Sequence, residues 1–453
     1  MYTDFYETNA RKYIMKKVVK FGGSSLANAE QFQKVGNIIR SDESRRFVVP
    51  SAPGKRFSGD TKVTDMLFRC YEAAQEGEDF INQLKAIKDR YYEIIRGLNL
   101  NLSLEEEFNQ IKTDFELQAG REYAASRGEF LNGKIMAAYL GYEFIDAADV
   151  IRFHRDGGFD PETTNELLSK RLFRCENAVI PGFYGASADG IVKTFSRGGS
   201  DVTGSLVARA IKADMYENWT DVSGFLVTDP RIVKDPVAIE SITYRELREL
   251  SYMGATVLHE EAIFPVRKEG IPINIRNTNK PEDEGTYIVE STCRKPKYTI
   301  TGIAGKKGFC SISVEKSLMN NEIGFGRKIL QVFEDQGISF EHMPSGIDTM
   351  TVYVHQDEFE QKEQQVIAGI HRAVQPDLVE MESDLALIAV VGRGMKSTRG
   401  TAGRIFSALA HANVNVKMID QGSSELNIII GVEDRDFETA VRAIYDIFVM
   451  TQC

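Results

Sequence analysis

KKVVKFGGSS, residues 16–25, gives the clearest indication of the fold of this chain. Its first six residues predict a β-strand, and the glycines that follow predict a turn. A helix should come next, with Phe32, Val35, Ile38 and Ile39 on one face. Short apolar strands and amphipathic helices then alternate to about residue 288. This alternation predicts an α/β domain built on a mostly parallel sheet.

The remaining elements of this domain follow from the same patterns. Strands are expected at 45–52, 215–222 and 271–276, with a hairpin formed by 177–184 and 191–195. Helices are expected at 65–74, 201–213, 244–253 and 257–268. Residues 79–118 predict two charged amphipathic helices in an insertion on the rim, whose charges are most simply a solvated face.

Length, composition and net charge limit the classes of protein to which this chain can belong. The 453 residues suffice for two or three domains, and 42% hydrophobic with 27% charged residues is typical of globular proteins. No apolar run is long enough to span a membrane, and a net charge of −11 disfavours nucleic acid as a partner. Residues 1–14 form a tail without signal-peptide features, and the five scattered cysteines read as spectator thiols. A cytoplasmic protein is expected. The six histidines show no metal-ligand spacing.

An internal repeat begins near residue 300 and appears when the sequence is shifted against itself by 76 positions. At this offset Ile312 aligns with Ile388, Ile329 with Ile405, and Val352 with Ile428, all without a gap. Each copy predicts the order strand, helix, strand, strand, with a further helix after it. The C-terminal third is therefore expected to be a paired regulatory module.

Three glycine-rich or acidic motifs are candidates for chemistry. In Lys20–Gly23 the glycines let backbone amides approach an anion, and Lys20 supplies a mobile charge for a phosphoryl group, although a plain turn is the simpler reading. Ser196–Asp201 has good helix caps, and Arg197 between them suits a carboxylate. Glu129 is expected at a helix start, where the dipole favours a carboxylate and a buried Glu could receive an ammonium.

A fourth candidate lies between a strand and a helix. It consists of Thr220-Asp221-Val222-Ser223-Gly224 and, a little later, Thr228-Asp229-Pro230-Arg231. Turn chemistry alone explains the Ser-Gly and Asp-Pro pairs. Arg231 could instead hold the phosphates of a nucleotide.

Together, in this order, the motifs resemble the aspartate kinase branch of the amino-acid kinase family. The matches are KFGGSS (20–25), SAPG (51–54) with Thr64-Asp65, GEFL (128–131), SRGGSD (196–201), WTDVSG (219–224), TDPR (228–231) and VLH (257–259). The repeat at 300–453 resembles the tandem ACT domains of such enzymes. The resemblance implies a three-layer αβα kinase domain at 15–292, followed by two βαββαβ ferredoxin-like ACT domains at 300–375 and 383–453. Residues 298–303 are expected to supply a strand to the second ACT domain.

The resemblance also implies an activity: transfer of the ATP γ-phosphate, with Mg²⁺, to L-aspartate to give 4-phospho-L-aspartate. Such enzymes are feedback-regulated through their ACT domains and form homodimers or dimers of dimers. The implied catalytic residues are Lys20, Gly22, Gly23 and Asp201. The implied aspartate-binding residues are Ser51, Thr64, Glu129, Arg197, Gly198, Gly199 and Ser200. The implied nucleotide-binding residues are Lys20, Phe21, Gly22, Gly23, Thr220, Asp221, Leu226, Arg231, Thr256 and Val257.

Within these sets the resemblance assigns roles. Arg197 would hold the α-carboxylate of aspartate, Glu129 its ammonium, and Ser51 with Thr64 the reacting end. Asp201 would hold Lys20. Two positions depart from the family pattern: Thr256 stands where a Lys is common, and Asn132 where a Ser is common. We expect Arg231 or Lys62 to compensate for the missing cation.

The effector is predicted from the first repeat. Gly324-Phe325 opens its helix, and Glu341 and Asp348 flank a glycine-rich turn. Two acids could accept a lysine ammonium, which favours lysine over threonine, but they could equally be solvated charges at strand ends.

The sequence also has to be weighed against alternative functions. Other members of the family, such as glutamate 5-kinase, acetylglutamate kinase and uridylate kinase, would not explain SRGGSD, TDPR and the repeats together. A catalytically silent amino-acid-binding regulator is the rival from another class. Gly392-Arg393-Gly394 reads as a strand-to-loop turn rather than a dinucleotide site, and the chain length leaves no room for a fused dehydrogenase.

Overall fold

The computed structural model describes residues 15–196, 198–255, 258, 260–292 and 297–450. It divides the chain into two compact units. The first unit contains the chain up to Phe225 together with Val257–Ser291, and the second contains Leu226–Thr256 together with the chain from Thr292. The expected kinase domain, 15–292, therefore includes a segment that packs with the C-terminal part of the chain.

The first unit is built on a mostly parallel sheet with the strand order β3-β5-β2-β1-β8-β10-β11. All of its pairings are parallel except that of β11 with β10. The strands are β1 (Lys17–Phe21), β2 (Arg45–Pro50), β3 (Glu143–Phe144), β5 (Ala178–Val179), β8 (Met215–Thr220), β10 (Ile273–Asn277) and β11 (Thr286–Val289).

Helices cover both faces of this sheet, which gives the expected three layers. Successive strand residues point to opposite faces, so Val19 and Phe21 face one side and Lys20 the other. On the Phe21 side lie the helices α1 (Ala29–Arg40), α2 (Val63–Gln75), α3 (Ile81–Gly97), α4 (Glu105–Glu116) and α5 (Arg121–Leu140). On the Lys20 side lies α8 (Gly199–Ile211), with α7 (Pro161–Leu172) and α10 (Glu260–Lys268) packed against it. The short elements are η1 (Gly23–Leu26) and α6 (Ala147–Val150).

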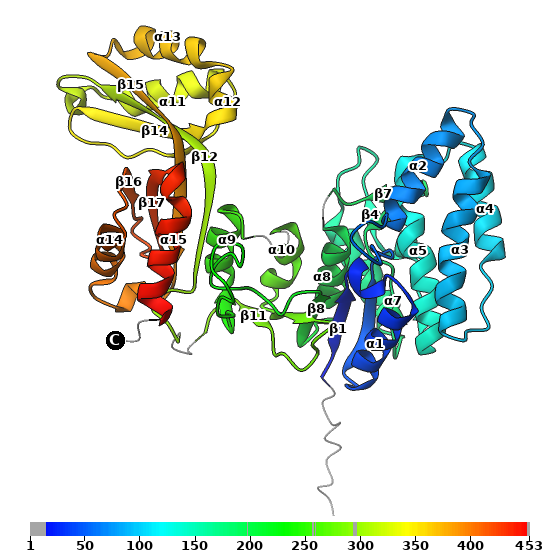
Figure 1. Ribbon diagram of the computed structural model, residues 1–453. Helices are drawn as coiled ribbons and strands as arrows, with labels where there is room; N and C mark the ends of the chain where they lie inside the picture. Colours follow the sequence, from blue (N-terminus) through cyan, green and yellow to red (C-terminus); the bar gives the residue numbers. More distant parts are fainter. Residues whose placement is uncertain (1–14, 197, 256–257, 259, 293–296, 451–453) are drawn as a thin grey trace, which may run out of the picture. The chain divides into compact units, whose positions relative to one another are not determined.

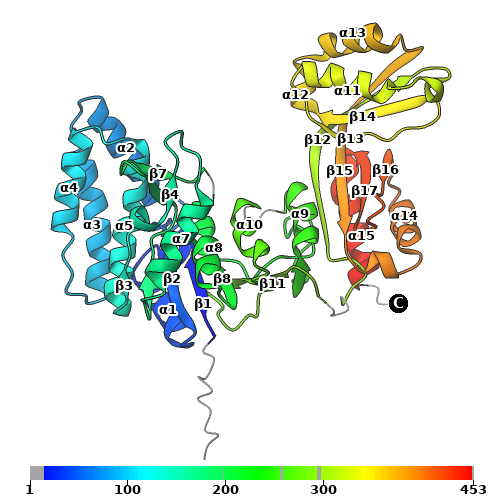
Figure 2. The same cartoon turned by 180° about the vertical axis from the view of Figure 1, so that it is seen from behind.

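The helices α2 to α5 form one group beside the sheet (Figures 1 and 2). The four residues predicted for the inner face of α1 are all buried, which confirms the periodicity. The expected solvated face of 79–118 is wrong at one position, because Arg90 on α3 is only 4% exposed.

The expected hairpin differs from the structure in its first strand. The antiparallel pair is β6 (Tyr184–Ser187) with β7 (Val192–Thr194), and β4 (Arg152–Phe153) joins them in a separate three-stranded sheet. Ala178 and Val179 instead enter the main sheet beside β2. Pro181 and Gly182 follow these two residues, and together they end the strand before the hairpin begins.

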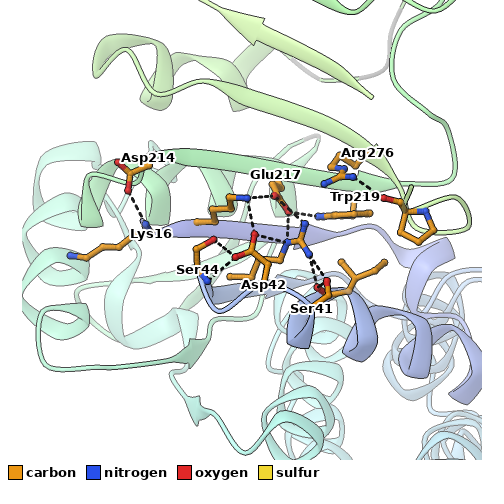
Figure 3. A network of polar contacts seen from close by, with 12 residues as sticks. Lys16, Ser41, Asp42, Ser44, Asp214, Glu217, Trp219 and Arg276 are labelled. Atoms are coloured by element: carbon orange, nitrogen blue, oxygen red, sulfur yellow. Dashed lines mark hydrogen bonds and ion pairs between the residues drawn. The ribbon is translucent and has the colours of Figure 1, made fainter. Parts of the chain in front are cut away.

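A buried polar network lies on the same face of the main sheet as Phe21 (Figure 3). Glu217 accepts hydrogen bonds from Trp219 Nε1 and Arg45 Nε, both at 2.8 Å, and lies 3.2 Å from Lys17 Nζ. Asp42 pairs with Lys17 at 2.8 Å, and this pairing helps to hold the pKa of the Asp42 carboxyl well below its usual range despite burial, which acts to raise it. The network ties the start of β1 to β2 and β8.

The second unit contains two copies of one βαββα pattern in a single sheet of order β13-β14-β12-β15-β17-β16. The first copy has β12 (Gly302–Glu315), α11 (Phe325–Asp335), β13 (Phe340–His342), β14 (Thr349–His355) and α13 (Glu363–Val374). The second has β15 (Leu378–Val391), α14 (Thr401–His411), β16 (Met418–Asp420), β17 (Asn427–Glu433) and α15 (Phe437–Tyr445). Shorter elements are η2 (Met319–Asn321), α12 (Gln356–Glu360), η3 (Met395–Ser397), η4 (Asp434–Asp436) and η5 (Asp446–Met450).

The repeat is visible in the backbone. The helices α11 and α14 begin 76 positions apart, each after a left-handed glycine: Gly324 has φ 81° and Gly400 has φ 82°. A residue with a side chain would be strained in this conformation. The long strand β12 serves both copies, because Gly302–Lys307 pairs with the later part of β15 whereas Phe309–Glu315 pairs with β14. The beginning of β12 thus pairs with the second copy, but of the residues expected there, 298–303, only Gly302 and Ile303 belong to the strand.

The segment 226–256 contributes β9 (Ser241–Thr243) and α9 (Tyr244–Tyr252) to the second unit. Ile303 N donates to Val227 O at 2.7 Å, and the side chain of Leu250 lies against Gly302. Backbone pairing and apolar packing therefore attach this segment to the start of β12. Among the residues that the structure describes, none of the helices combines the length and the apolar character that crossing a membrane demands.

Candidate active site

Lys20 lies near the end of β1, on the face covered by α8. Its Nζ is 2.6 Å from Asp201 Oδ1 and 3.5 Å from Asn218 Oδ1, and Lys20 as a whole is 8% exposed. Asn218 Nδ2 donates to the same Asp201 oxygen at 2.9 Å. Asp201 is the third residue of α8, and Asn218 stands beside Lys20 in the register of β8 with β1. The ammonium is therefore held at the carboxyl edge of the sheet by two strands and one helix.

The turn after β1 packs against the loop after β2. Gly54 N donates to Gly23 O at 2.8 Å, and a Cβ on Gly54 would lie 2.5 Å from Gly23 C. A Cβ on Gly23 would lie 2.8 Å from Ala52 O, so neither position has room for a side chain. The amide of Gly22 donates to Trp219 O at 3.0 Å. The expectation that both glycine amides face an anion therefore does not hold for Gly22 in this conformation, since its N–H already has a partner.

Glu129 lies on the opposite side of the same loop. It is 6% exposed, and the amide of Ala52 hydrogen-bonds to its carboxyl group. Among the described residues its Oε2 has no hydrogen-bond partner. Burial raises the pKa of Glu129 to about 8, although these backbone hydrogen bonds act to lower it. The expected helix start is wrong: Glu129 is the ninth residue of α5, so burial rather than the helix dipole sets its charge state.

The loop itself carries Ser51, and α2 after it carries Thr64. Ser51 N donates to Phe21 O at 3.0 Å, and Asn132 Nδ2 donates to Ser51 O at 2.6 Å. Thr64 is the second residue of α2, and its Oγ1 would lie 3.8 Å from a Cβ on Gly128. Ser51, Thr64 and Glu129 are thus gathered around one loop beside the Gly23 turn.

The SRGGSD motif opens α8. Gly198 has φ 56° and precedes the first helical residue, Gly199, while Ser200 is 8% exposed. These residues share the start of α8 with Asp201, the partner of Lys20. Arg197, predicted to bind a carboxylate, lies outside the described residues, as do Thr256 and Val257.

The predicted nucleotide residues are divided between the two units. Phe21 ends β1, and Thr220 ends β8 with exposed Asp221 after it, all in the first unit. Leu226 and Arg231 belong to the second unit, where they line a cavity of about 510 Å³ that also contains Lys234.

The two cations expected to compensate for Thr256 have different surroundings. Arg231 is 88% exposed, and its Nη2 lies 2.6 Å from Asp229 Oδ2, so its charge is already paired. Lys62 precedes α2 as its cap residue and is exposed in the first unit. A larger cavity, about 560 Å³, borders the Arg45 network and contains none of the predicted site residues.

The predicted regulatory residues lie in the first repeat of the second unit. Gly324 and buried Phe325 form the start of α11, and Asp348 is exposed before β14. Glu341 on β13 is not a solvated strand-end charge, because its side chain is 7% exposed and lies 3.3 Å from His355 Nε2. Burial and a hydrogen bond to Glu341 raise the pKa of Tyr252, on α9, to about 12.

Asn218 was not predicted from the sequence, and Asn132 was predicted only as a departure from the family pattern. Both are almost completely buried and bond to predicted site residues. The position of Asn218, one residue before the WTDVSG motif on an apolar strand, was the available signal. A buried amide in a strand requires a polar partner.

Comparison with known proteins agrees with this geometry. The amino acid kinase family matches residues 15–277, and an ACT domain matches residues 388–448. Aspartokinase 3 of Bacillus subtilis is 43% identical over 95% of this chain and 98% of its own length.

Solved structures give the same result over 96% of this chain. The aspartate kinase of Clostridium acetobutylicum is 52% identical, with a TM-score of 0.87 over 96% of this chain and all of that one. Escherichia coli aspartokinase III, in complex with lysine and aspartate, is 25% identical with a TM-score of 0.70, over 96% of this chain and 99% of that one. With the paired Lys20, the glycine turn and the ACT repeats in place, the chain belongs to the aspartate kinase branch of the amino acid kinase family, a group of ATP-dependent kinases.

Proposed function

We propose that this protein transfers the γ-phosphoryl group of MgATP to the β-carboxylate of L-aspartate, giving 4-phospho-L-aspartate and ADP. One observation carries the proposal: the loop Ser51–Gly54 contacts the Gly23 turn on one side and Glu129 on the other. A phosphate-binding turn and a buried acceptor for an ammonium therefore flank one small region. A substrate that carries both an ammonium and an acidic group fits such a region.

The reaction needs charge neutralisation more than proton transfer. The β-carboxylate, with an ordinary pKa of about 3.9, is already ionised at neutral pH and can attack without a general base. One carboxylate oxygen forms a bond to the γ-phosphorus while the bond from that phosphorus to the bridging oxygen of ADP breaks. Two unit charges 4 Å apart repel by about 4 kcal/mol at an effective dielectric of 20. Lys20 and the Gly23 amide would offset this repulsion, and Mg²⁺, bound with ATP, would supply further positive charge.

Aspartate is placed by the groups around the loop. Glu129 would receive the ammonium, Arg197 the α-carboxylate, and Ser51 with Thr64 the reacting carboxylate. Gly198, Gly199 and Ser200 would form the adjoining wall. Asp201 and Asn218 hold Lys20, because both accept hydrogen bonds from its ammonium.

The nucleotide would lie against Phe21, the Gly22-Gly23 turn, Thr220 and Asp221. By the resemblance, Leu226, Arg231, Thr256 and Val257 would also contact the nucleotide, and Arg231 would then leave Asp229 to bind phosphate. The hypothesis that Arg231 or Lys62 replaces the missing lysine predicts how turnover should change in variants. Turnover should fall in the double variant Arg231→Ala/Lys62→Ala more than in either single variant.

Regulation is proposed to act through the ACT repeats, with lysine as the effector and Glu341 and Asp348 as acceptors of its side-chain ammonium. The support is the lysine-bound Escherichia coli aspartokinase III, which shares the fold, and the low exposure of Glu341. We also propose a cytoplasmic homodimer or dimer of dimers. The described cysteines, Cys70, Cys175 and Cys310, are free thiols, as a reducing compartment requires.

The test is a direct assay. Purified protein, ATP, Mg²⁺ and L-aspartate are incubated with hydroxylamine, which traps an acyl phosphate as its hydroxamate. Glutamate, N-acetylglutamate and UMP in parallel reactions distinguish the other members of the family. Hydroxamate from aspartate alone supports the proposal, whereas binding of amino acids without any turnover would identify a silent regulator.

A further inference from the structure

Arg90 is a buried cation that the residues assigned above do not include. It lies in the middle of α3, in the helical insertion, and is 4% exposed. A guanidinium so deeply buried needs several acceptors, because an unpaired buried charge costs several kcal/mol. Its burial lowers its pKa, although the nearby Asp60 carboxylate acts to raise it.

The acceptors of Arg90 are the backbones of two segments of the candidate site. Nη2 donates to Gly54 O, and Nη1 donates to Thr61 O at 2.6 Å. Gly54 ends the loop that begins with Ser51 and is itself bonded to Gly23. Thr61 precedes α2, whose second residue is Thr64. One planar side chain therefore joins the end of the Ser51 loop to the start of the Thr64 helix, across the turn of residues 55–60.

An ion pair with Asp60 fixes the orientation of the Arg90 guanidinium. Nη2 lies 3.3 Å from Asp60 Oδ2, and Asp60 in turn pairs with Arg56 Nε at 2.9 Å. Arg56 also reaches Glu93, one turn after Arg90 on α3, at 3.3 Å. The turn of residues 55–60 is thus tied back to the helix at two points.

The next residue of the helix makes a similar backbone contact, to the residue before Glu129. Tyr91 is fully buried, and its hydroxyl donates to Gly128 O at 2.7 Å. Gly128 is in contact with the same loop, since a Cβ there would lie 2.8 Å from Ala52 Cβ. Two consecutive residues of α3 therefore hold the backbones on both sides of the region assigned to aspartate.

We propose that Arg90 is a positioning residue for the phosphoryl acceptor: it fixes the spacing of Ser51 and Thr64 relative to the Gly23 turn, through Gly54 O and Thr61 O. The inference rests on the proposed function, because Ser51 and Thr64 are there assigned to the reacting end of aspartate. Loss of Arg90 leaves Lys20, Asp201 and Asn218 in place, since none of them contacts it. In a variant without Arg90, the residues assigned to aspartate should therefore lose their fixed positions, whereas those that hold Lys20 should keep theirs.

The test compares Arg90→Met with a matched control, Arg45→Met. Arg45 is equally buried, at 6% exposed, and also pairs with a carboxylate, Glu217, but its partners lie on the other face of the sheet from Lys20. A displacement of about 1 Å at a reacting group costs on the order of 100-fold in rate. We expect Arg90→Met to lower kcat for aspartate about 100-fold, with the Kd of ATP within about threefold of its original value. Arg45→Met should lower the unfolding midpoint while keeping kcat within about threefold.

Three further variants guard against misfolding of Arg90→Met. Arg90→Lys keeps the charge but cannot reach both carbonyls at once, so it should recover only part of kcat. Asp60→Asn leaves Arg90 in place and removes its charged partner, so kcat should fall by a smaller factor. In Arg90→Ala, guanidinium ion at millimolar concentration should restore activity, and it should do nothing for Arg45→Ala.

The outcomes separate the two proposals. If the unmodified protein makes no aspartyl hydroxamate, the proposed function fails. If it does, and Arg90→Met or Asp60→Asn keeps the original kcat, Arg90 is no positioning residue. Equal losses of kcat in Arg90→Met and Arg45→Met, each in proportion to lost stability, would also overturn the inference.

Discussion

The carboxylate of Glu246 lies 2.9 Å from Nη1 of Arg393, and both residues belong to the second unit. Glu246 is completely buried and also accepts hydrogen bonds from Arg393 N at 2.8 Å and Thr301 Oγ1 at 2.6 Å. It is the third residue of α9 and closes a capping box with Thr243. One carboxylate therefore joins α9 to the residue before β12 and to the loop after β15, and this explains why 226–256 packs with the repeats.

Arg393→Met should destabilise the second unit by about 3 kcal/mol, because it leaves a buried carboxylate without its charged partner. The single tryptophan, Trp219, lies in the first unit, so its fluorescence reports that unit alone, whereas circular dichroism reports both. Urea unfolding should show an earlier transition by circular dichroism and an unchanged one by fluorescence. Arg435→Met, which removes an exposed partner of Glu433, is the control and should change stability by less than about 1 kcal/mol. Equal effects of the two substitutions would contradict the assignment.

The same carboxylate predicts a pH dependence. Burial acts to raise the pKa of Glu246, but hydrogen bonds from Thr301, Arg393 N and Thr243 outweigh it, and the net pKa is lowered. Its contribution to stability is therefore fully present above the unfolded pKa of about 4.3 and is lost as pH falls through the lower folded pKa. Acid titration of the second-unit transition measures this loss. Glu246→Gln should abolish this part of the pH dependence.

Lys20→Met should lower kcat by two to three orders of magnitude, roughly the cost of removing one preorganised charge at a reacting group. Asp201→Asn keeps the shape and the bond to Asn218 but removes the charge that holds Lys20, so a smaller loss of kcat is expected. Steady-state kinetics with saturating ATP measures both. Lys34→Met, which alters an exposed lysine of α1, is the control. Undiminished turnover by Lys20→Met would remove the basis of the proposed mechanism.

Substrate binding should depend on the ionisation of Glu129. Its raised pKa of about 8 means that the free protein carries a neutral carboxyl at neutral pH, whereas an ammonium prefers the carboxylate. kcat/KM for aspartate, which reports the groups of the free enzyme, should therefore rise as pH increases from about 6 to 8. Glu129→Gln should abolish this rise together with most of the affinity for aspartate. A flat profile in the unmodified protein would argue against Glu129 as the ammonium acceptor.

Glu129→Gln should also stabilise the ligand-free protein. A carboxyl whose pKa is raised on folding binds an extra proton in the folded state between about pH 4.3 and 8, so stability falls as pH rises through this window. Removing the group should add about 3 kcal/mol at pH 7. Chemical unfolding at pH 5 and pH 7 measures the difference. A variant that is more stable and yet binds no aspartate cannot be explained by misfolding.

Gly54→Ala should lower activity strongly, because its Cβ would meet Gly23 C at 2.5 Å and force the glycine turn away from the loop. A loss of about 100-fold in kcat is expected for a displacement of this kind. Gly59→Ala is the matched control in the following turn, since its Cβ would meet only the ring of Phe57 at an ordinary 3.7 Å. Similar kinetics for the two variants would show that the close approach has no role.

Glu341→Gln should raise the lysine concentration needed for half-inhibition by at least about tenfold, the factor that corresponds to 1.4 kcal/mol of lost binding free energy. The kcat without lysine should stay unchanged. Inhibition curves with lysine, threonine and both compare the variant with the original protein. Asp348→Asn tests the second acid in the same way. If threonine inhibits and lysine does not, the assignment of the effector is wrong.

The layers of the fold, the repeat and most of the candidate site could be predicted from the amino-acid sequence alone. Alternating short strands and amphipathic helices require a covered parallel sheet, and the buried inner face of α1 follows from its periodicity. The offset of 76 residues reappears as two helices that begin after left-handed glycines. Lys20, the Gly-Gly turn and Asp201 were recognisable because each belongs to a short sequence motif that resembles those of a known family.

Contacts between residues far apart in the sequence could be seen only once the chain was folded. Arg90 occurs in a helical stretch with charges typical of a solvated surface, yet it is buried. Local periodicity cannot show this, because burial depends on the helices and loops that pack over a residue. The grouping of 226–256 with the repeats was equally invisible, since it depends on Glu246 meeting Arg393, a partner 147 residues away. Contacts over such distances arise from the packing of whole elements, and no local pattern encodes them.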